Sequence, residues 1–320
     1  NIIKTGSYVG NGSSSAPPSI YLGWEPQWVM VKRTNGSGGQ DWVMVDSMRG
    51  MYRGESTMPH LRANSTNLEQ DTSYYRIDVS SGTGFAPFTT DNGLNGDGDE
   101  YIYIALRRSD GYVGKPLEVG TNAFAMDTGA GSTTIPNFDG NFPVDFSIIA
   151  TPGTAGQHRN TGARLTGPKY MRTNGNNAES GHAGFTFDWN AGWGSQGDGS
   201  NWQSWHWKRH AGFDVVTYKG NLVAGRQIPH SLNKIPEMLW VKRRNDTSDW
   251  IVWHKGLNSG TNSGQYYVRL NSSNAESSAN YYWNNTTQNS KTSFTLGGDA
   301  SVNGENDTFI SMLFASVDGI

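Results

Sequence analysis

Residues 26–33 read Pro-Gln-Trp-Val-Met-Val-Lys-Arg, and residues 236–243 read Pro-Glu-Met-Leu-Trp-Val-Lys-Arg. Aromatic and β-branched residues in such short runs fit the pleated, half-buried surface of a β-strand. Comparable runs at 101–106, 145–150 and 308–314 are separated by Gly, Asn and Asp, which supply the positive φ of tight turns. Because long helical periodicity is absent, the sequence predicts an all-β fold and disfavours parallel βαβ units.

One motif, Asn-x-x-Asn-x-Glu, occurs three times along the chain. Its copies are Asn64, Asn67 and Glu69; Asn174, Asn177 and Glu179; and Asn271, Asn274 and Glu276. The sequence therefore predicts three tandem antiparallel β-sandwich repeats at 1–112, 113–212 and 213–320, each long enough for its own core. The middle repeat is diverged, and in it Gly184-Phe185 is expected to take the place of Gly84-Phe85.

The repeated pattern, from the Pro-led strand through Asp-Trp to Asn-x-x-Asn-x-Glu, resembles a module of large structural proteins of marine bacteriophages. Those tandem-repeat modules are similar to concanavalin A-like lectin domains. The resemblance implies a jelly-roll sandwich and a place on the virion surface, in a tail fibre or a capsid fibre or decoration. It also implies other virion proteins as partners, a host glycan or receptor as ligand, and a homo-oligomer.

Composition excludes several classes of protein. The chain has 320 residues, 12% aromatic, so it is not a disordered solvating chain. The net charge of −3 gives no field for nucleic acid, and basic runs such as 242–244 are expected to be solvated strand ends. No apolar run suits membrane insertion, and the absence of Cys removes disulfides and thiolate sites. Because the chain starts with Asn1, we expect that it was trimmed or begins inside a longer protein.

The Asn motif has two interpretations. Its amides and carboxylate are the oxygen ligands that sugars and Ca²⁺ require. Alternatively, the Asn side chains cap a turn by bonding the backbone two residues on, and the Glu satisfies a buried strand end. A feature present in every copy favours this structural role. A separate acidic loop carries Asp97, Asp99 and Glu100, which makes calcium an alternative to the expectation of no cofactor. That loop lacks the EF-hand spacing, and a hairpin turn accounts for it equally well.

Motifs for catalysis are absent from the sequence. There is no Gly-x-Ser-x-Gly elbow, no paired-histidine metal motif and no Glu-x-Asp-x-x-Glu strand of sandwich glucanases. His206 is expected to face away from Trp205 and Trp207 on one strand. The sequence thus predicts a non-enzymatic virion surface protein that serves as spacer and adhesion module. A glycan-active depolymerase and a secreted bacterial lectin-like adhesin are the alternatives.

Tryptophan gives the strongest indication of binding. Trp42 and Trp250 occupy matching positions, so we expect both to be buried. Four others, Trp24, Trp189, Trp193 and Trp283, have no counterpart, and they are expected either to bind or to fill gaps between repeats. In the diverged repeat we predict a ligand site with Trp189 or Trp193 exposed beside Asp198 and Asn201, suited to sugar rings or to a neighbouring subunit.

Overall fold

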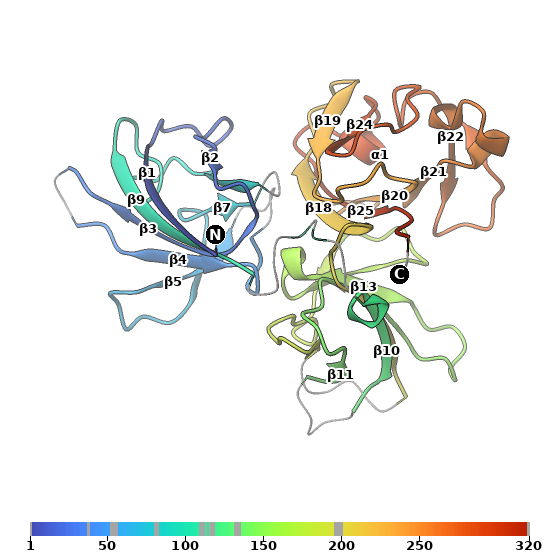
Figure 1. The fold of residues 1–320 in the computed structure, drawn as a ribbon, viewed down its shortest axis with the longest axis horizontal. Helices are drawn as coiled ribbons and strands as arrows, with labels where there is room; N and C mark the ends of the chain where they lie inside the picture. Colours follow the sequence, from blue (N-terminus) through green and yellow to red (C-terminus); the bar gives the residue numbers. More distant parts are fainter. Residues whose placement is uncertain are drawn as a thin grey trace. The chain divides into compact units, whose positions relative to one another are not determined.

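The computed structural model describes residues 2–36, 39–51, 57–79, 83–108, 113, 115, 119–130, 136–194 and 201–318. Nearly every regular element in these ranges is a strand, which confirms the all-β prediction. The chain divides into two compact units, 1–112 and 113–320, coloured blue to teal and green to red in Figure 1. No helix in the described ranges is long and apolar enough to cross a membrane.

The first unit contains a six-stranded antiparallel sheet of order β1-β9-β3-β4-β5-β6 and a three-stranded sheet of order β2-β8-β7. The bounds are β1 (Ile3–Val9), β2 (Ile20–Tyr21), β3 (Pro26–Arg33), β4 (Val43–Asp46), β5 (Met58–Arg62), β6 (Gln70–Thr72), β7 (Ile77–Asp78), β8 (Gly84–Pro87) and β9 (Glu100–Arg107). Ring contacts of Phe85 with Tyr8 and Tyr103 join the two sheets into a sandwich.

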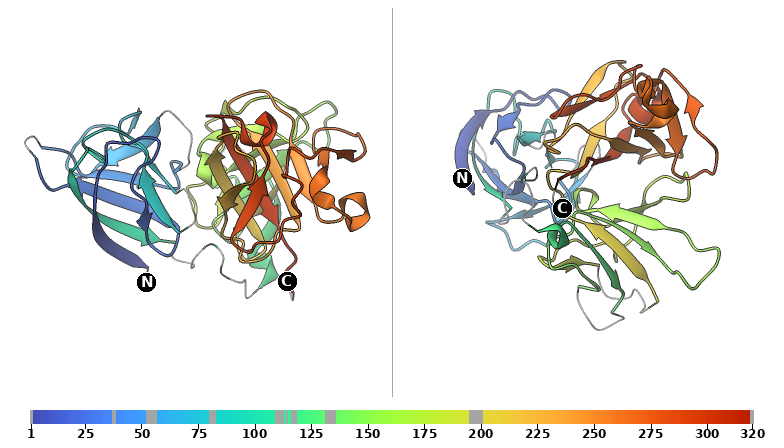
Figure 2. Two further views of the ribbon diagram at one scale, coloured as in Figure 1. Left: turned by 90° about the horizontal axis from the view of Figure 1, so that it is seen from above. Right: turned by 45° about the vertical axis from the view of Figure 1, so that its right-hand side comes forward.

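The second unit contains two more six-stranded sheets, which repeat that strand order: β10-β17-β12-β13-β14-β15 and β18-β25-β20-β21-β22-β23. A two-stranded sheet accompanies each, β11-β16 and β19-β24. We number the three resulting sandwiches first, second and third along the chain. Figure 2 shows the second and third, green and orange to red, meeting where the chain passes from β17 to β18.

The strands of the second sandwich are β10 (Phe124–Thr128), β11 (Phe138–Asp139), β12 (Phe146–Ala150), β13 (Asn160–Ala163), β14 (Lys169–Arg172), β15 (Ser180–Gly181), β16 (Gly192–Trp193) and β17 (Gln203–Trp207). Those of the third are β18 (Phe213–Lys219), β19 (Arg226–Pro229), β20 (Met238–Arg243), β21 (Ile251–His254), β22 (Tyr266–Arg269), β23 (Ser277–Ser278), β24 (Ser293–Leu296) and β25 (Thr308–Phe314). The short helices are α1 (Ala300–Asn303) and four 3-10 turns, η1 (Gly120–Asn122), η2 (Arg164–Thr166), η3 (Leu257–Gly260) and η4 (Ser263–Gln265).

Alternation along the strands divides each large sheet into an inward and an outward face. On β3 the side chains of Val29 and Val31 are fully buried, whereas their neighbours Trp28 and Met30 are half-buried. The third sandwich follows the same rule, and its core places Leu239 and Val241 of β20 against Phe294 of β24. The hydrophobic effect thus fixes the register, because a shift by one residue would exchange the two faces.

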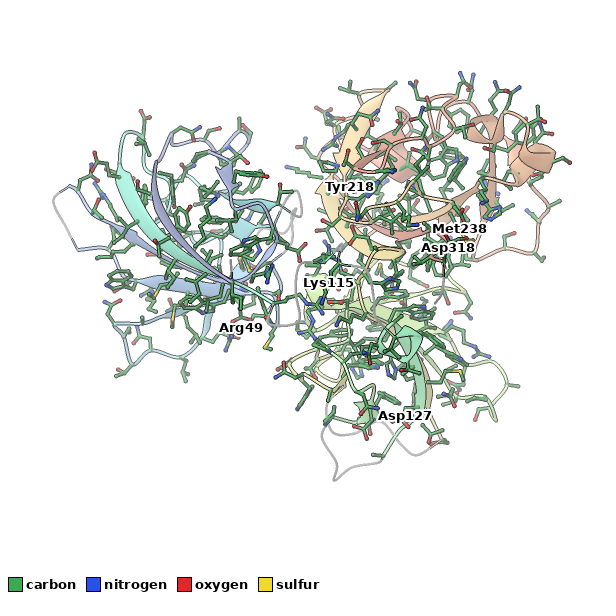
Figure 3. The ribbon with its side chains drawn as sticks, viewed as in Figure 1. Arg49, Lys115, Asp127, Tyr218, Met238 and Asp318 are labelled. Carbon is green, nitrogen blue, oxygen red and sulfur yellow. The ribbon has the colours of Figure 1, made fainter. Side chains whose placement is uncertain are left out.

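The first and third sandwiches share the turn before their last strand. The Tyr8 hydroxyl donates to the Leu94 carbonyl, and the Tyr218 hydroxyl donates to the Val302 carbonyl, each at 2.7 Å. Figure 3 labels Tyr218 in the third sandwich. A Cβ on Gly220 would lie 1.9 Å from the Gly304 carbonyl oxygen, so this close approach of two backbones requires glycine.

A buried network of charged side chains joins the second sandwich to the third. The Arg209 backbone N–H donates to Asp145 Oδ2, and the Arg209 guanidinium donates to Asp214 Oδ1, each at 2.7 Å. Arg164 Nε lies 3.5 Å from Asp145 Oδ1. All four side chains are at most 5% exposed, so separating the two sandwiches would leave charges unpaired in an apolar setting.

Candidate functional site

The predicted ligand site in the second sandwich does not form as expected. The prediction is that Trp189 or Trp193 is exposed, and Trp193, at 0% exposure, is not the open ring. Its indole stacks on Phe187 with 5.2 Å between ring centroids, and its Nε1 donates to Ser204 Oγ at 2.9 Å. Trp189 is half-buried and Asn201 is exposed, while Asp198 lies outside the described residues.

Trp193 is buried because it belongs to a strand. Gly192-Trp193 forms β16, which pairs with β11 as Gly84-Phe85 of β8 pairs with β2. A Cβ on Gly84 or Gly192 would lie 2.0 or 2.2 Å from a carbonyl oxygen of the partner strand, so both pairs require glycine for the same reason. The counterpart of Gly84-Phe85 is therefore Gly192-Trp193, and the sequence-based assignment to Gly184-Phe185 is corrected.

The other unmatched tryptophans also contribute to cores. Trp24 and Trp283 are buried, and Trp283 Nε1 donates to the Tyr266 carbonyl at 3.1 Å. Among the four unmatched tryptophans, only Trp189 retains partial exposure. Filling of the sandwich interior, rather than ligand binding, accounts for Trp24, Trp193 and Trp283.

The first Asn of each motif makes the same contact in all three sandwiches. The side-chain oxygens of Asn64, Asn174 and Asn271 accept hydrogen bonds from the backbone N–H groups of Trp42, Arg159 and Trp250 at 2.8, 3.0 and 2.9 Å. Each of these N–H groups lies just before the strand that follows the Pro-led strand. The first Asn therefore ties a turn to a neighbouring strand. This contact is structural, but it differs from the expected cap, in which the Asn side chain bonds the backbone two residues on.

The Glu of the motif differs between copies. Glu69 accepts from the Arg49 guanidinium, and Glu276 Oε2 accepts from the Asn258 N–H at 2.8 Å, both at exposed positions. Glu179 instead receives two hydrogen bonds from Arg244, at 2.8 and 2.9 Å. The Arg244 side chain is fully buried, so the expectation that residues 242–244 form a solvated strand end is wrong.

The acidic loop of the first unit is engaged with a basic side chain. Asp99 Oδ1 accepts from Arg33 Nη2 at 2.6 Å, and Asp307 of the third sandwich lies 3.2 Å from Arg243 Nε. Asp97 and Glu100 are exposed. Among the described residues, no three His, Cys, Asp or Glu side chains gather in an arrangement that would hold a metal ion.

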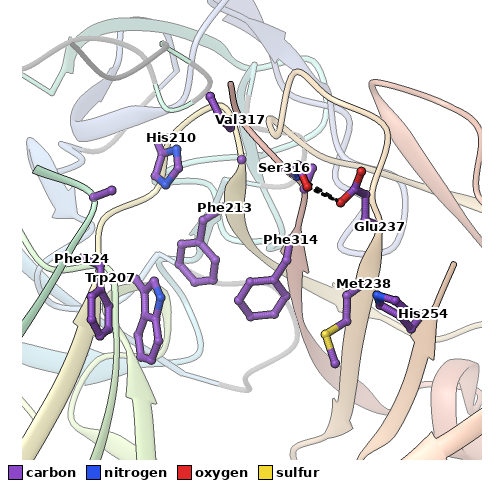
Figure 4. Close-up of a pocket in the computed structure, with 13 residues that line it drawn as sticks. Phe124, Trp207, His210, Phe213, Glu237, Met238, His254, Phe314, Ser316 and Val317 are labelled. Atoms are coloured by element: carbon purple, nitrogen blue, oxygen red, sulfur yellow. Dashed lines mark hydrogen bonds between the residues drawn. The ribbon is translucent and has the colours of Figure 1, made fainter. Parts of the chain in front are cut away.

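A pocket of about 470 Å³ opens between the second and third sandwiches (Figure 4). One wall comes from Phe124, at the start of β10, and Trp207, at the end of β17, which are paired in register. The other comes from Phe213 and Phe314, which pair between β18 and β25. Centroid distances of 4.9, 6.2 and 5.2 Å link these four rings into a row.

Polar groups stand at the edge of this aromatic pocket. Glu237 accepts hydrogen bonds from Lys255 Nζ at 2.7 Å and from Ser316 Oγ at 2.6 Å, and these contacts lower the pKa of its carboxyl, which is therefore ionised at neutral pH. Burial lowers the pKa of His210, with Lys208 adding to the effect, so its imidazole is neutral. His254 is exposed, and its Nδ1 accepts from the Gly256 N–H at 3.0 Å.

This geometry suits binding. Flat ring faces bury the apolar side of a ligand, and the Glu237 carboxylate and two imidazoles can hydrogen-bond to its polar side. Ser316 donates its hydroxyl hydrogen to an ionised carboxylate that also holds Lys255, a different arrangement from the serine–imidazole pair of an activated nucleophile.

Sequence reasoning missed the pocket because its walls come from two different sandwiches. The available signal was the pair Trp205 and Trp207, which flank His206 in the sequence. The His206 imidazole is buried in the sandwich, as the alternation along the strand predicted. Both neighbouring indoles therefore lie on the outward face of the sheet. None of Trp189, Trp193 and Asn201 lines the pocket.

Comparison with known proteins gives a family. No curated protein and no solved structure matches the chain. A family model described as "Domain of unknown function (DUF7483)" matches residues 3–109 and 154–320, which include the first sandwich, most of the second and all of the third. The chain therefore belongs to the DUF7483 family.

Proposed function

We propose that the protein is a non-enzymatic structural component of a bacteriophage virion surface, which serves as a spacer and binds a host-surface glycan through the pocket of the second unit. The observation that carries the glycan proposal is the row Phe124, Trp207, Phe213 and Phe314 beside the Glu237 carboxylate. Sugar rings present C–H faces that stack on aromatic rings and hydroxyls that need oxygen or nitrogen partners. A volume of about 470 Å³ lies within the usual range of small-ligand sites.

The spacer role is supported by the way the second unit is built. Two sandwiches of equal strand order follow one another, and buried ion pairs hold them together. The location on a virion rests on the resemblance of the repeated sequence pattern to phage structural modules. Other virion proteins and the host glycan are the partners that this proposal implies.

The glycan proposal is tested by binding the purified chain to an array of bacterial surface polysaccharides and measuring affinities by calorimetry. Phe124 is 37% exposed, so Phe124→Ala removes a pocket ring with little effect on the core. We expect this variant to bind about tenfold more weakly, the usual value of one aromatic contact. Tyr281→Ala is the matched control, since Tyr281 is exposed and does not line the pocket.

Equal affinities for Phe124→Ala and the unaltered chain would contradict the assignment of the glycan to the pocket. The virion proposal has its own test, which is immunogold labelling of purified particles with an antibody against this chain. Labelled particle surfaces are expected, and particles without label would overturn it. Release of reducing ends from a bound polysaccharide would instead show a depolymerase.

A further inference from the structure

The outward face of the third sandwich's large sheet is covered within the second unit. Ile310 and Met312 of β25 and Lys242 of β20 are 0% exposed, although their side chains face away from the sandwich's own core. Trp250, just before β21, is equally buried. The cover comes from the second sandwich, whose η2 packs on β18 and whose turn between β14 and β15 carries the Asn motif.

Specific contacts hold that turn in place. Trp250 Nε1 donates to the Arg172 carbonyl at 2.8 Å, and the Ser248 N–H donates to the Asn176 carbonyl at 2.9 Å. The Glu179 carboxylate makes its two hydrogen bonds with Arg244 and also attracts Lys242. A motif-bearing turn of one sandwich thus binds the outward face of another.

The first unit has the same outward face without such a cover in that unit. By register, Ile102 pairs with Lys32 as Ile310 pairs with Lys242, and Ile104 pairs with Met30 as Met312 pairs with Trp240. Ile102 is 41% exposed where Ile310 is 0%. Trp42, the counterpart of Trp250, is half-buried, so the expectation that both are buried is wrong for Trp42. Contiguous apolar surface of this kind marks an interaction site.

The third sandwich carries a solvent-exposed counterpart of the covering turn, in which one oxygen of Glu276 is bonded to the Asn258 N–H of the same sandwich. Between β22 and β23 it places Arg269, Ser273 and Glu276 where the second sandwich has Arg172, Asn176 and Glu179. Ser273 and Glu276 are exposed. The acidic end of this turn complements Lys32 of the first unit, which is the counterpart of Lys242. The first unit has Thr34 at the position of Arg244, so it lacks the second cation of the internal contact.

We propose that the outward face of the first unit's six-stranded sheet, centred on Ile102, Met30 and Trp42, binds the turn at residues 269–276 of a second copy of this chain. The contact is head-to-tail, so each copy uses one face and one turn, and repetition gives rings or filaments. Because Thr34 cannot reproduce the Arg244 ion pair, the association is weaker than the internal one and depends on concentration.

The test is sedimentation velocity of the full chain from about 1 to about 300 μM, a range that reports micromolar association. We expect the unaltered chain to grow in mass with concentration. Ile102→Lys, which places a charge in the apolar face, and Glu276→Lys, which reverses the charge of the turn, should each stay monomeric. Tyr21→Lys is the control, since Tyr21 is an exposed aromatic on the smaller sheet of the first unit and should leave association unchanged.

Mixing the two variants distinguishes the head-to-tail geometry from others. The Ile102→Lys chain keeps its turn and the Glu276→Lys chain keeps its face, so an equimolar mixture should form dimers and no larger species. A symmetric face-to-face dimer would instead be unaffected by Glu276→Lys. Such a result, or a chain that stays monomeric at every concentration, would overturn the proposal.

Discussion

Glu179 and Arg244 form a two-point ion pair, with oxygen–nitrogen distances of 2.8 and 2.9 Å, between the turn of the second sandwich and the end of β20 in the third. Both side chains are at most 5% exposed. A third hydrogen bond between the same residues joins the Glu179 N–H to the Arg244 carbonyl at 2.7 Å. The motif Glu is thus an exposed side chain in the first and third sandwiches, whereas in the second it forms a buried ion pair with the third sandwich.

Removing one partner of this pair should destabilise the second unit strongly. Arg244→Ala leaves the Glu179 carboxylate buried without its principal cation, and we expect the free energy of unfolding in urea to fall by roughly 3–5 kcal/mol. Glu69→Ala is the matched control, because Glu69 is the same motif position on an exposed surface and should cost at most about 1 kcal/mol. If Arg244→Ala lowers the free energy of unfolding by no more than Glu69→Ala does, the ion pair does not stabilise the contact between the two sandwiches.

The first Asn of the motif should contribute to stability and not to ligand binding. Asn64→Ala removes the acceptor of the Trp42 N–H and the donor to Asp41 Oδ1 at 2.8 Å. We expect the free energy of unfolding of the first unit, measured by thermal unfolding, to fall by about 1 kcal/mol. Asn67→Ala, at an exposed position of the same turn, serves as control and should have a smaller effect. Unchanged unfolding together with lost polysaccharide binding would favour the ligand interpretation of the motif.

Trp193 should behave as a core residue. Trp193→Ala empties a site enclosed by Phe138, Phe185 and Phe187, and the free energy of unfolding should fall by about 3–5 kcal/mol. Trp189→Ala, at a half-buried neighbouring position, should cost less. Urea unfolding followed by circular dichroism measures both. A stable Trp193→Ala chain would show that this indole is dispensable to the second sandwich.

Stability should fall on mild acidification because of His206. Burial lowers the pKa of this imidazole from 6.5 to about 4, so the unfolded chain binds more protons than the folded chain between these pH values. Stability is therefore lost as the pH drops from about 6.5 towards 4, and His206 accounts for roughly 2 kcal/mol between pH 7 and pH 5. His206→Gln should reduce the difference in unfolding free energy between pH 7 and pH 5 by that amount.

The control for the pH experiment is His254→Gln, because His254 is exposed at the rim of the pocket. The effect of His206→Gln on this difference should exceed that of His254→Gln, because of these two imidazoles only that of His206 is buried. His60 and His230 also have pKa values lowered by burial, so part of the acid sensitivity should persist in His206→Gln. If His206→Gln leaves the pH dependence unchanged, protonation of the His206 imidazole does not lower the free energy of unfolding.

The strand framework was readable from local pattern because inward and outward residues alternate with a period of two. Val29 and Val31 of β3, and Leu239 and Val241 of β20, are buried as that pattern requires. The Asn motif could be identified from sequence because it recurs in each sandwich, but its partner could not. The expected cap bonds the backbone two residues on, whereas the bonds run to the N–H groups of Trp42, Arg159 and Trp250 beside another strand.

Features that depend on contacts between sandwiches could not be predicted from the sequence. Lys242 and Arg244 resemble a solvated strand end in sequence, yet the second sandwich covers them. Trp42 and Trp250 share a sequence context and differ in burial for the same reason. Gly192-Trp193 was misplaced because two aromatic-rich stretches compete for one strand, and only the pairing with β11 decides between them. The pocket could not be predicted either, because its rings come from two sandwiches and from strand ends far apart in the sequence.

The buried charges at the passage from β17 to β18 bear on the rigidity of the pocket. Arg209 links Asp145 of the second sandwich to Asp214 of the third, and the pocket walls start on either side of this link. Moving the walls apart would separate these buried charges from their partners, which is costly, so the link favours one fixed spacing of the walls. For the glycan that we propose as ligand, a preformed spacing of the rings would provide selectivity, and little conformational entropy would be lost on binding.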